Sequence, residues 1–253
     1  YILYEDGEDT VMAETMAILS EESYKLQVNE EVRGLLNKLN ANSESLDEIT
    51  RREVEEELKQ LKKLENVPIE EYAAYSRLIS EASVKWREAK QTNDYPLFKP
   101  YLERIIAAQK SLMAHMYPGK DTYDALLEEF SEGLSVEMLD PFFANVKAKL
   151  VPVIHAVCQS GNQADDSLLH RPFPIEGQRR LSSFVMDFLG IDRDSCVIGE
   201  VEHPFTTEFN KHDVRLTTHY HEDDVLSNMF SVAHEGGHCL YELNMGDELI
   251  GSP

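Results

Sequence analysis

The chain has 253 residues, of which 42% are hydrophobic, so it is long enough to bury the core of one large domain. Its formal net charge of -23 argues against nucleic acid or an anionic membrane as a partner, because both are polyanions that would repel it. Three cysteines at no metal-ligand spacing favour a reducing compartment, and we expect a cytoplasmic protein. No apolar run approaches the roughly 20 residues needed to span a bilayer, and no signal peptide is visible.

The first 190 residues are expected to form a helical array. Apolar residues recur at spacings of three and four from Thr10 to Lys90, which is typical of amphipathic helices. Pro68 is expected to open a new helix, and residues 93–96 to interrupt it. Glycine and proline punctuation predicts four further helices, at residues 100–117, 122–130, 135–158 and 176–189.

The pattern changes after residue 190. Residues 197–202 and 213–220 are rich in Val, Thr, Ile and Tyr, and the turn-rich residues 210–212 lie between them. Such segments predict an antiparallel pair of strands in a small β region at residues 191–222. A last helix is expected at residues 223–244, because Asp223 and Asp224 suit a helix start.

This last helix carries a candidate metal site, His234-Glu235-Gly236-Gly237-His238. Two histidines four residues apart project from one face of a helix and can bind one metal ion, and the glutamate between them is placed to act as a general base. The two glycines each cost a helix up to about 1 kcal/mol relative to alanine. They are understandable if a strand or a substrate approaches the backbone beside the metal.

A third metal ligand is not evident in the sequence. Catalytic zinc takes three protein ligands and leaves one position open. Glu242 lies two turns past His234, a rise of about 12 Å, so it is not expected to share an ion with both histidines. Glu248 follows the exit from the helix and is a weak candidate. We therefore expect the third ligand beyond residue 253.

Other polar residues gather just before the predicted zinc helix. On a strand, Asp213, Arg215 and Thr217 alternate onto one face. They form either a structural salt bridge or a substrate contact, in which the Arg215 guanidinium suits a carboxylate or a developing oxyanion. His203 and Arg215 are candidates for contacts with substrate, and Asp213 for orienting a neighbour.

Several of these residues occur together in an order that resembles the carboxypeptidase Taq family of metallocarboxypeptidases. The segments that carry the resemblance are His203-Pro204-Phe205, Asp213-x-Arg215-x-Thr217, Tyr220-x-x-Asp223-Asp224, the run from His234 to Glu242, and, upstream, residues 86–89 and 122–127. The similarity spans most of the chain but only about half of a family member. We therefore expect residues 1–253 to be a single, truncated peptidase domain.

The resemblance implies a mainly helical, zincin-like metallopeptidase with a small antiparallel sheet beside the zinc helix. Members of the family are typically homodimers that remove C-terminal residues from peptides with broad specificity, using one zinc or cobalt ion. His234 and His238 match two metal ligands, and Glu235 matches the catalytic carboxylate. The third ligand of the family is the glutamate of a His-Glu-Ser-Gln motif, which these 253 residues do not contain.

Two alternatives remain open at the level of sequence. A helical endopeptidase or oligopeptidase would carry the same His-Glu-x-x-His motif. A non-catalytic helical module, which keeps part of the fold and binds peptide or metal weakly, would also fit, because two histidines alone should hold zinc loosely.

Overall fold

The computed structural model confirms a mainly helical protein with one small sheet beside the helix of the His-Glu-x-x-His motif. It describes residues 8–161, 165–169, 171–250 and 252. The chain divides into two compact units, one up to Val153 and the other from Ile154 to Ser252. We describe each unit by itself.

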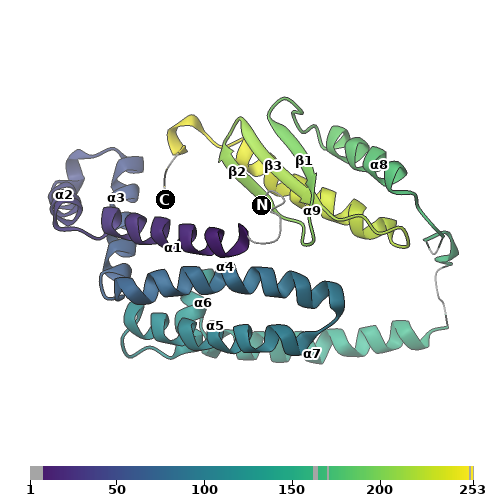
Figure 1. Cartoon of the computed structure of the whole chain (residues 1–253), viewed down its shortest axis with the longest axis horizontal. Coiled ribbons are helices and arrows are strands. Elements are labelled where there is room, and N and C mark those ends of the chain that lie inside the picture. Colours follow the sequence, from purple (N-terminus) through teal and green to yellow (C-terminus); the bar gives the residue numbers. More distant parts are fainter. Residues whose placement is uncertain (1–7, 162–164, 170, 251, 253) are drawn as a thin grey trace. The chain divides into compact units, whose positions relative to one another are not determined.

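The first unit is helical (Figure 1). Helix α1 packs on α4, α4 packs on α5, and α2 packs on α3. Val67, Leu112, Met113 and Ala125 form the centre of one hydrophobic cluster. The elements are α1 (Glu8–Gln27), α2 (Glu30–Ala41), the short 3-10 helix η1 (Ser43–Ser45), α3 (Glu48–Leu64), α4 (Ile69–Thr92), α5 (Tyr95–Met116) and α6 (Thr122–Phe130).

The start of α5 differs from the sequence prediction. Helix α4 ends at Thr92 and is capped by Asn93, which adopts a left-handed conformation with φ of 53°. Asp94 then accepts a hydrogen bond from the backbone N–H of Leu97 and begins α5 at Tyr95, five residues before the predicted start at Pro100. Pro96 lies in the first turn, where its missing N–H costs nothing. The break between the two helices is therefore only two residues long.

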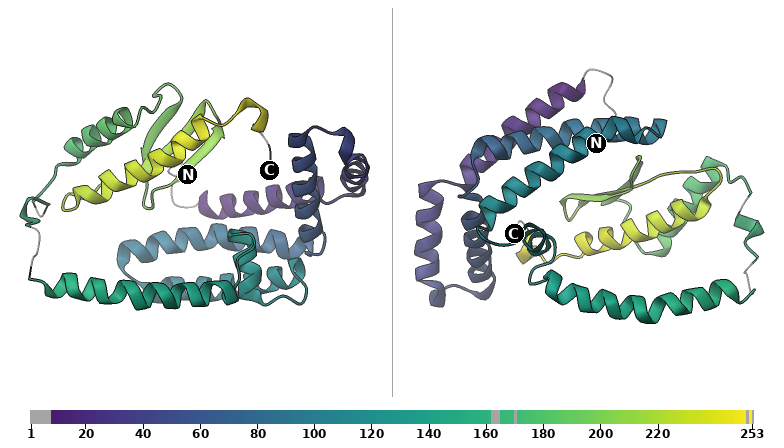
Figure 2. Two further views of the ribbon diagram at one scale, coloured as in Figure 1. Left: turned by 180° about the vertical axis from the view of Figure 1, so that it is seen from behind. Right: turned by 90° about the horizontal axis from the view of Figure 1, so that it is seen from below.

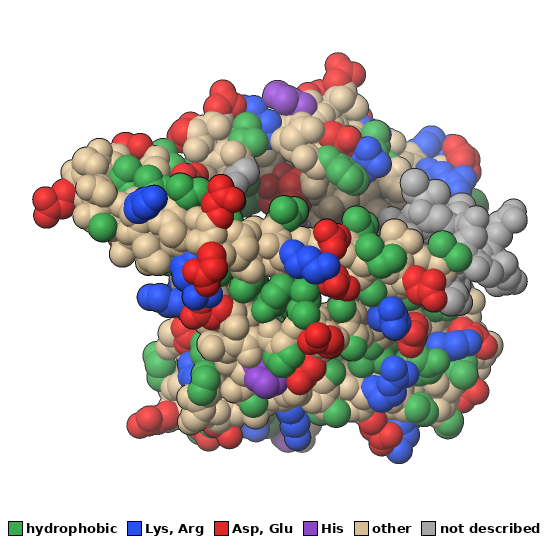
Figure 3. Space-filling model, turned by 60° about the vertical axis from the view of Figure 1, so that its left-hand side comes forward, with side chains coloured by type: hydrophobic (Ala, Val, Ile, Leu, Met, Phe, Trp, Pro, Cys, Tyr) green, Lys and Arg blue, Asp and Glu red, His purple; other side chains and the backbone are tan. Residues whose placement is uncertain are grey.

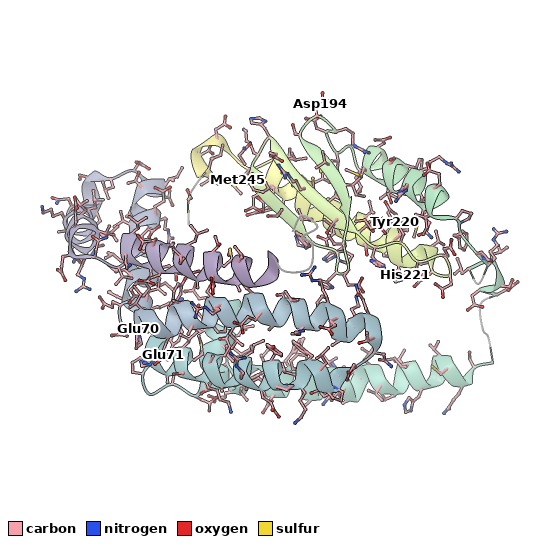
Figure 4. The ribbon with its side chains drawn as sticks, viewed as in Figure 1. Glu70, Glu71, Asp194, Tyr220, His221 and Met245 are labelled. Carbon is pink, nitrogen blue, oxygen red and sulfur yellow. The ribbon has the colours of Figure 1, made fainter. Side chains whose placement is uncertain are left out.

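Several acidic residues of the first unit form ion pairs with basic ones. Red acidic and blue basic side chains lie interspersed in Figure 3. Lys59 pairs with Glu132 at 2.6 Å and Lys63 with Glu129 at 2.7 Å. Glu70 and Glu71 occupy the first turn of α4, where carboxylates complement the helix dipole (Figure 4).

Helix α7 (Val136–Gln159) contains the boundary between the two units. Its bounds differ by one residue at each end from the predicted 135–158. Pro141 and Pro152 lie inside it, and no residue of the helix is buried. None of the helices in the described ranges is both long and apolar enough to cross a membrane.

The second unit contains the sheet and the helix of the His-Glu-x-x-His motif. Its elements are the 3-10 helix η2 (Ser167–Leu169), α8 (Ile175–Phe188), β1 (Cys196–Glu200), β2 (Thr206–Asn210), β3 (Asp213–Thr218), α9 (Val225–Leu243) and the 3-10 helix η3 (Asp247–Leu249). Helix α9 packs against β3 and β2, and α8 packs against α9. Figure 1 shows the sheet in front of α9, and the left view of Figure 2 shows α9 in front of the strands.

The strand pairing corrects the sequence prediction. The sheet has the order β1-β3-β2, and the two strands that we predicted to be antiparallel, β1 and β3, are parallel. Strand β2, which the sequence analysis missed, runs antiparallel to β3. The predicted turn around Lys211 therefore joins β2 to β3. Because β2 reverses the chain between β1 and β3, those two strands run in the same direction.

A buried polar network fixes α9 to its neighbours. The Asn228 side-chain oxygen accepts hydrogen bonds from the hydroxyls of Ser182, at 2.9 Å, and Thr218, at 3.0 Å. Gln178 donates to the main-chain oxygen of His221 at 2.6 Å. Tyr220 and His221 precede α9, whereas Met245 follows its other end (Figure 4). Since an unpaired buried polar group costs about 1–3 kcal/mol, the network favours one placement of α8 and β3 around α9.

Two cysteine thiols meet in the core of this unit. Cys239 on α9 and Cys196 on β1 are buried, and their sulfur atoms are 3.1 Å apart. Burial and the neighbouring Cys196 raise the pKa of the Cys239 thiol to about 12. Cys158 on α7 is exposed.

The glycines of the motif allow a paired test. A Cβ on Gly236 would lie 2.6 Å from Leu189 Cδ1 and 3.2 Å from Ile191 Cδ1, whereas a Cβ on Gly237 would meet no described atom within 4 Å. We expect Gly237→Ala to raise the free energy of unfolding by up to about 1 kcal/mol through helix propensity. Gly236→Ala should lower it by up to about 2 kcal/mol, because overpacking outweighs the same gain. Urea unfolding of both variants measures the difference, and equal effects would contradict this account.

The thiols predict a labelling pattern. With iodoacetamide at about pH 8, the folded protein should react quickly at Cys158 alone, because the thiolate is the reactive species and the other two thiols are buried. In urea all three thiols should react. Mass spectrometry counts the modified cysteines, and Cys158→Ser serves as the control that leaves no fast site. Fast labelling of Cys239 in the folded protein would show that the core of this unit opens.

Candidate active site

The local sequence of α9 determines which of its residues are buried. Asp224 accepts a hydrogen bond from the backbone N–H of Ser227 and begins the helix. The buried residues recur at spacings of three and four, which places them on one face against the sheet and α8. These residues are Asn228, Val232, Glu235, Gly236 and Cys239. His234 and His238 are exposed, so one turn of helix presents two imidazoles outward and one carboxylate inward.

The two histidines come together as the sequence predicted. Their Nε2 atoms are 3.3 Å apart, and the rings meet nearly edge to face at an interplanar angle of 83°. Two nitrogens bound at about 2.05 Å to one tetrahedral ion would be separated by about 3.4 Å. The pair therefore fits one divalent ion of the zinc type. The same distance also suits a hydrogen bond between one protonated and one unprotonated ring nitrogen.

Glu235 lies beside this pair on the buried side of the helix. Its exposed fraction is 7%, and its Oε2 is 2.8 Å from the hydroxyl oxygen of Thr206 on β2. Glu235 and His238 also line a pocket of about 330 Å³. The other lining residues are Pro204, Phe205, Thr206, Glu208 and Glu242. A carboxylate, an imidazole and an apolar wall thus share one cavity, which suits general-base chemistry on a bound molecule.

The candidate substrate residues Arg215 and Asp213 do not line this pocket. Asp213 accepts two hydrogen bonds from Arg215, both at 2.9 Å, and the Arg215 guanidinium stacks over Phe209 at 4.4 Å from the ring centre. This pairing lowers the pKa of Asp213 and raises that of Arg215. Arg215 alternates with the buried Val214 and Leu216, so it lies on the face of β3 turned away from them. The geometry favours the structural salt bridge, and a role in substrate binding stays a prediction.

His203 is exposed in the loop before β2, and the next two residues, Pro204 and Phe205, form part of the pocket wall. Thr217 holds this wall in place. Its hydroxyl accepts a hydrogen bond from the Phe205 N–H at 2.8 Å and lies 2.8 Å from the Phe205 carbonyl oxygen, to which it donates. The Thr217 N–H donates to the same carbonyl at 2.9 Å. The segments that contain Phe205 and Thr217, for which the sequence showed only the order along the chain, are therefore in direct contact.

Sequence reasoning missed Thr206 and Glu208, because it did not predict β2. The alternation of residues 206 and 208 toward one face would have been the signal for them. Glu242 lines the pocket, and the Glu248 carboxylate lies beside Gly246 rather than the histidines. Within the part of the chain that the structure describes, no three His, Cys, Asp or Glu side chains come together as a metal site.

A helix with two adjacent exposed histidines, a buried glutamate between them and a pocket against the neighbouring strand defines the class of His-Glu-x-x-His metallopeptidases. Comparison with known proteins identifies the family within this class. The family model of the carboxypeptidase Taq (M32) metallopeptidases matches residues 5–253, and the chain belongs to this family.

The individual relatives agree with this family. The chain is 36% identical to carboxypeptidase 1 of Bacillus subtilis over 240 residues, which cover 95% of this chain and 48% of that protein. It is 35% identical to thermostable carboxypeptidase 1 of Thermus thermophilus over 183 residues, 69% of this chain and 36% of that one. The chain thus spans about half the length of the first of these relatives, and less of the second.

Solved structures give the same result. The crystal structure of BsuCP superposes with a TM-score of 0.96 at 35% identity, covering 99% of this chain and 50% of that one. The M32 carboxypeptidase from Deinococcus radiodurans R1 superposes with a TM-score of 0.83 at 27% identity, again over 99% of this chain and 50% of that one.

Proposed function

We propose that this chain provides the His-Glu-x-x-His part of the active site of a metal-dependent carboxypeptidase, which releases C-terminal residues from peptides with broad specificity. The observation that carries the proposal is the joint placement of His234, His238 and Glu235 on one turn of α9. The two imidazole nitrogens are 3.3 Å apart, and the carboxylate lines the adjoining pocket with His238. Family membership supports hydrolysis of peptides at this site.

In this proposal His234 and His238 hold one divalent ion, zinc or cobalt, together with a third ligand beyond residue 253. The bound ion supplies Lewis-acid polarisation of the scissile carbonyl and lowers the pKa of water. The Glu235 carboxylate accepts the proton of the attacking water and transfers it to the nitrogen of the leaving amino acid. Pro204 and Phe205 form the apolar side of the pocket that receives the peptide.

We propose the partners, the location and the domain organisation of the protein together with this function. Family members that match this chain are peptidases, so peptides are the expected partners, and we propose a cytoplasmic homodimer for the complete protein. We also propose that both compact units belong to one peptidase domain, because the family model runs across their boundary. With two ligands on α9, we expect these 253 residues alone to bind metal weakly and to show little turnover.

Metal binding tests the ligand pair directly. Isothermal titration of the chain with Zn²⁺ should show weak binding to one site, reduced at least about tenfold by His234→Ala or His238→Ala. His219→Ala is the matched control, since its ring also lies against a second histidine, His221, at a centroid distance of 4.4 Å. Affinity that is unchanged in both α9 variants, or lost only in the control, would place the metal elsewhere.

Hydrolysis tests the reaction itself. We expect a form extended to the length of the relatives to release the C-terminal residue of a blocked dipeptide once zinc or cobalt is supplied, and Glu235→Gln to lower kcat by at least about a hundredfold. Cleavage inside long, C-terminally amidated peptides would instead indicate an endopeptidase. An extended protein that is inert with every metal tested would contradict both enzymes and leave the non-catalytic module.

A further inference from the structure

Strand β2 directs alternate residues toward α9. Thr206 pairs with the buried Leu216 of β3, and Thr207 pairs with Arg215 on the opposite face. Because directly opposed residues in an antiparallel pair share a face, Thr206 faces α9 and Thr207 faces away. The packing of α9 against β2 and β3 agrees with this assignment.

The residue that Thr206 meets is Glu235. Its hydroxyl oxygen lies 2.8 Å from Oε2 of the carboxylate and 3.0 Å from the main-chain oxygen of the same residue. Among the described side chains, Thr206 is the one that donates a hydrogen bond to this carboxylate. With an exposed fraction of 7%, Glu235 has little access to water, so this donor bears on both its stability and its orientation.

Thr206, which carries this donor, is held in place through the preceding residue. Phe205, directly before Thr206, forms three hydrogen-bonded contacts with Thr217 of β3, two through its carbonyl oxygen and one through its N–H. The sheet therefore holds Phe205 through Thr217, and α9 holds Thr206 through Glu235. A group fixed in this way can orient a carboxylate within the narrow tolerance that proton transfer requires.

We propose that Thr206 is a positioning residue for Glu235: its hydroxyl donates to Oε2 and holds the carboxylate toward the pocket beside His238. The catalytic consequence rests on the proposed function, in which Glu235 is the general base. The hydrogen bond itself does not depend on that function. The two parts can therefore be tested separately.

A double-mutant cycle in urea unfolding tests the contact. Thr206→Val removes the hydroxyl at nearly constant shape, Glu235→Met removes the carboxylate, and a chelator excludes any contribution of bound metal. We expect Thr206→Val to lower the unfolding-derived stability constant about tenfold or more in the parent chain, and much less in the Glu235→Met background. Equal effects in both backgrounds would overturn the proposal, since the hydroxyl would then serve only the main-chain oxygen.

Kinetics of the extended, metal-loaded form test the positioning role. Thr206→Val should lower kcat about tenfold to a hundredfold and leave KM within about twofold, whereas Thr206→Ser should restore most of kcat. Thr207→Val, on the other face of the same strand, is the matched control and should change neither constant. A rise in KM at constant kcat, failure of serine to restore kcat, or an equal loss in the control would overturn the positioning role. If the parent form were inert, the proposed function would fail, while the unfolding cycle would still decide the contact.

Discussion

Helix α9 must bury a carboxylate and expose two imidazoles within a single turn, and the second unit is built around that constraint. A buried carboxylate is unfavourable unless donors reach it, while the two histidines that we propose as metal ligands need an open side from which an ion and a substrate can approach. The spacing of the apolar residues resolves the conflict, because it turns Glu235 toward the strands and leaves His234 and His238 on the outer side. The packing of α9 on β2 and β3 thus determines which side of the motif is chemically accessible.

The rotation of α9 about its own axis depends on polar contacts as well as on apolar packing. Asn228 lies seven residues, about two turns, before Glu235 on the same buried face, and its amide joins α9 to Ser182 of α8 and Thr218 of β3. Hydrogen bonds of this kind are directional, so they resist a slide or rotation that a purely apolar interface would tolerate. The polar network therefore helps to hold the Glu235 carboxylate about two turns further along the helix.

The sequence segments that carry the family resemblance have different roles in the sheet and the loop before it. Residues 204–206 line the pocket, Thr217 holds Phe205 in position, and Arg215 pairs with Asp213 outside the pocket lining. Segments that occur together along the chain thus have three different roles: one lines the pocket, one supports that lining, and one forms an ion pair outside it. Arg215 and Thr217 are two residues apart on β3 and share a face, and their roles differ because Phe205 is hydrogen-bonded to Thr217, whereas Asp213 is hydrogen-bonded to Arg215.

Much of the fold follows from the sequence itself. Glycine and proline punctuation located α6 at its observed bounds and α7 within one residue, and the acidic pair at residues 223–224 located the start of α9. The spacing of His234 and His238 implied that their side chains meet, because residues four apart on a helix share a face. These are local properties, set by residues within about one turn of each other. The predicted start of α5 at Pro100 was wrong, because Asp94 caps the helix and begins it five residues earlier.

Only the tertiary structure decided the contacts between distant residues. The parallel pairing of β1 with β3, the approach of Leu189 and Ile191 to Gly236, and the placement of Arg215 away from the pocket depend on how separate elements pack. Thr206 reaches Glu235 across 29 positions, and Cys196 reaches Cys239 across 43. The sequence alone therefore determined the helices and the histidine pair. The packing of the sheet against α9 decided what surrounds that pair, because a strand has no preferred partner until its neighbours are in place.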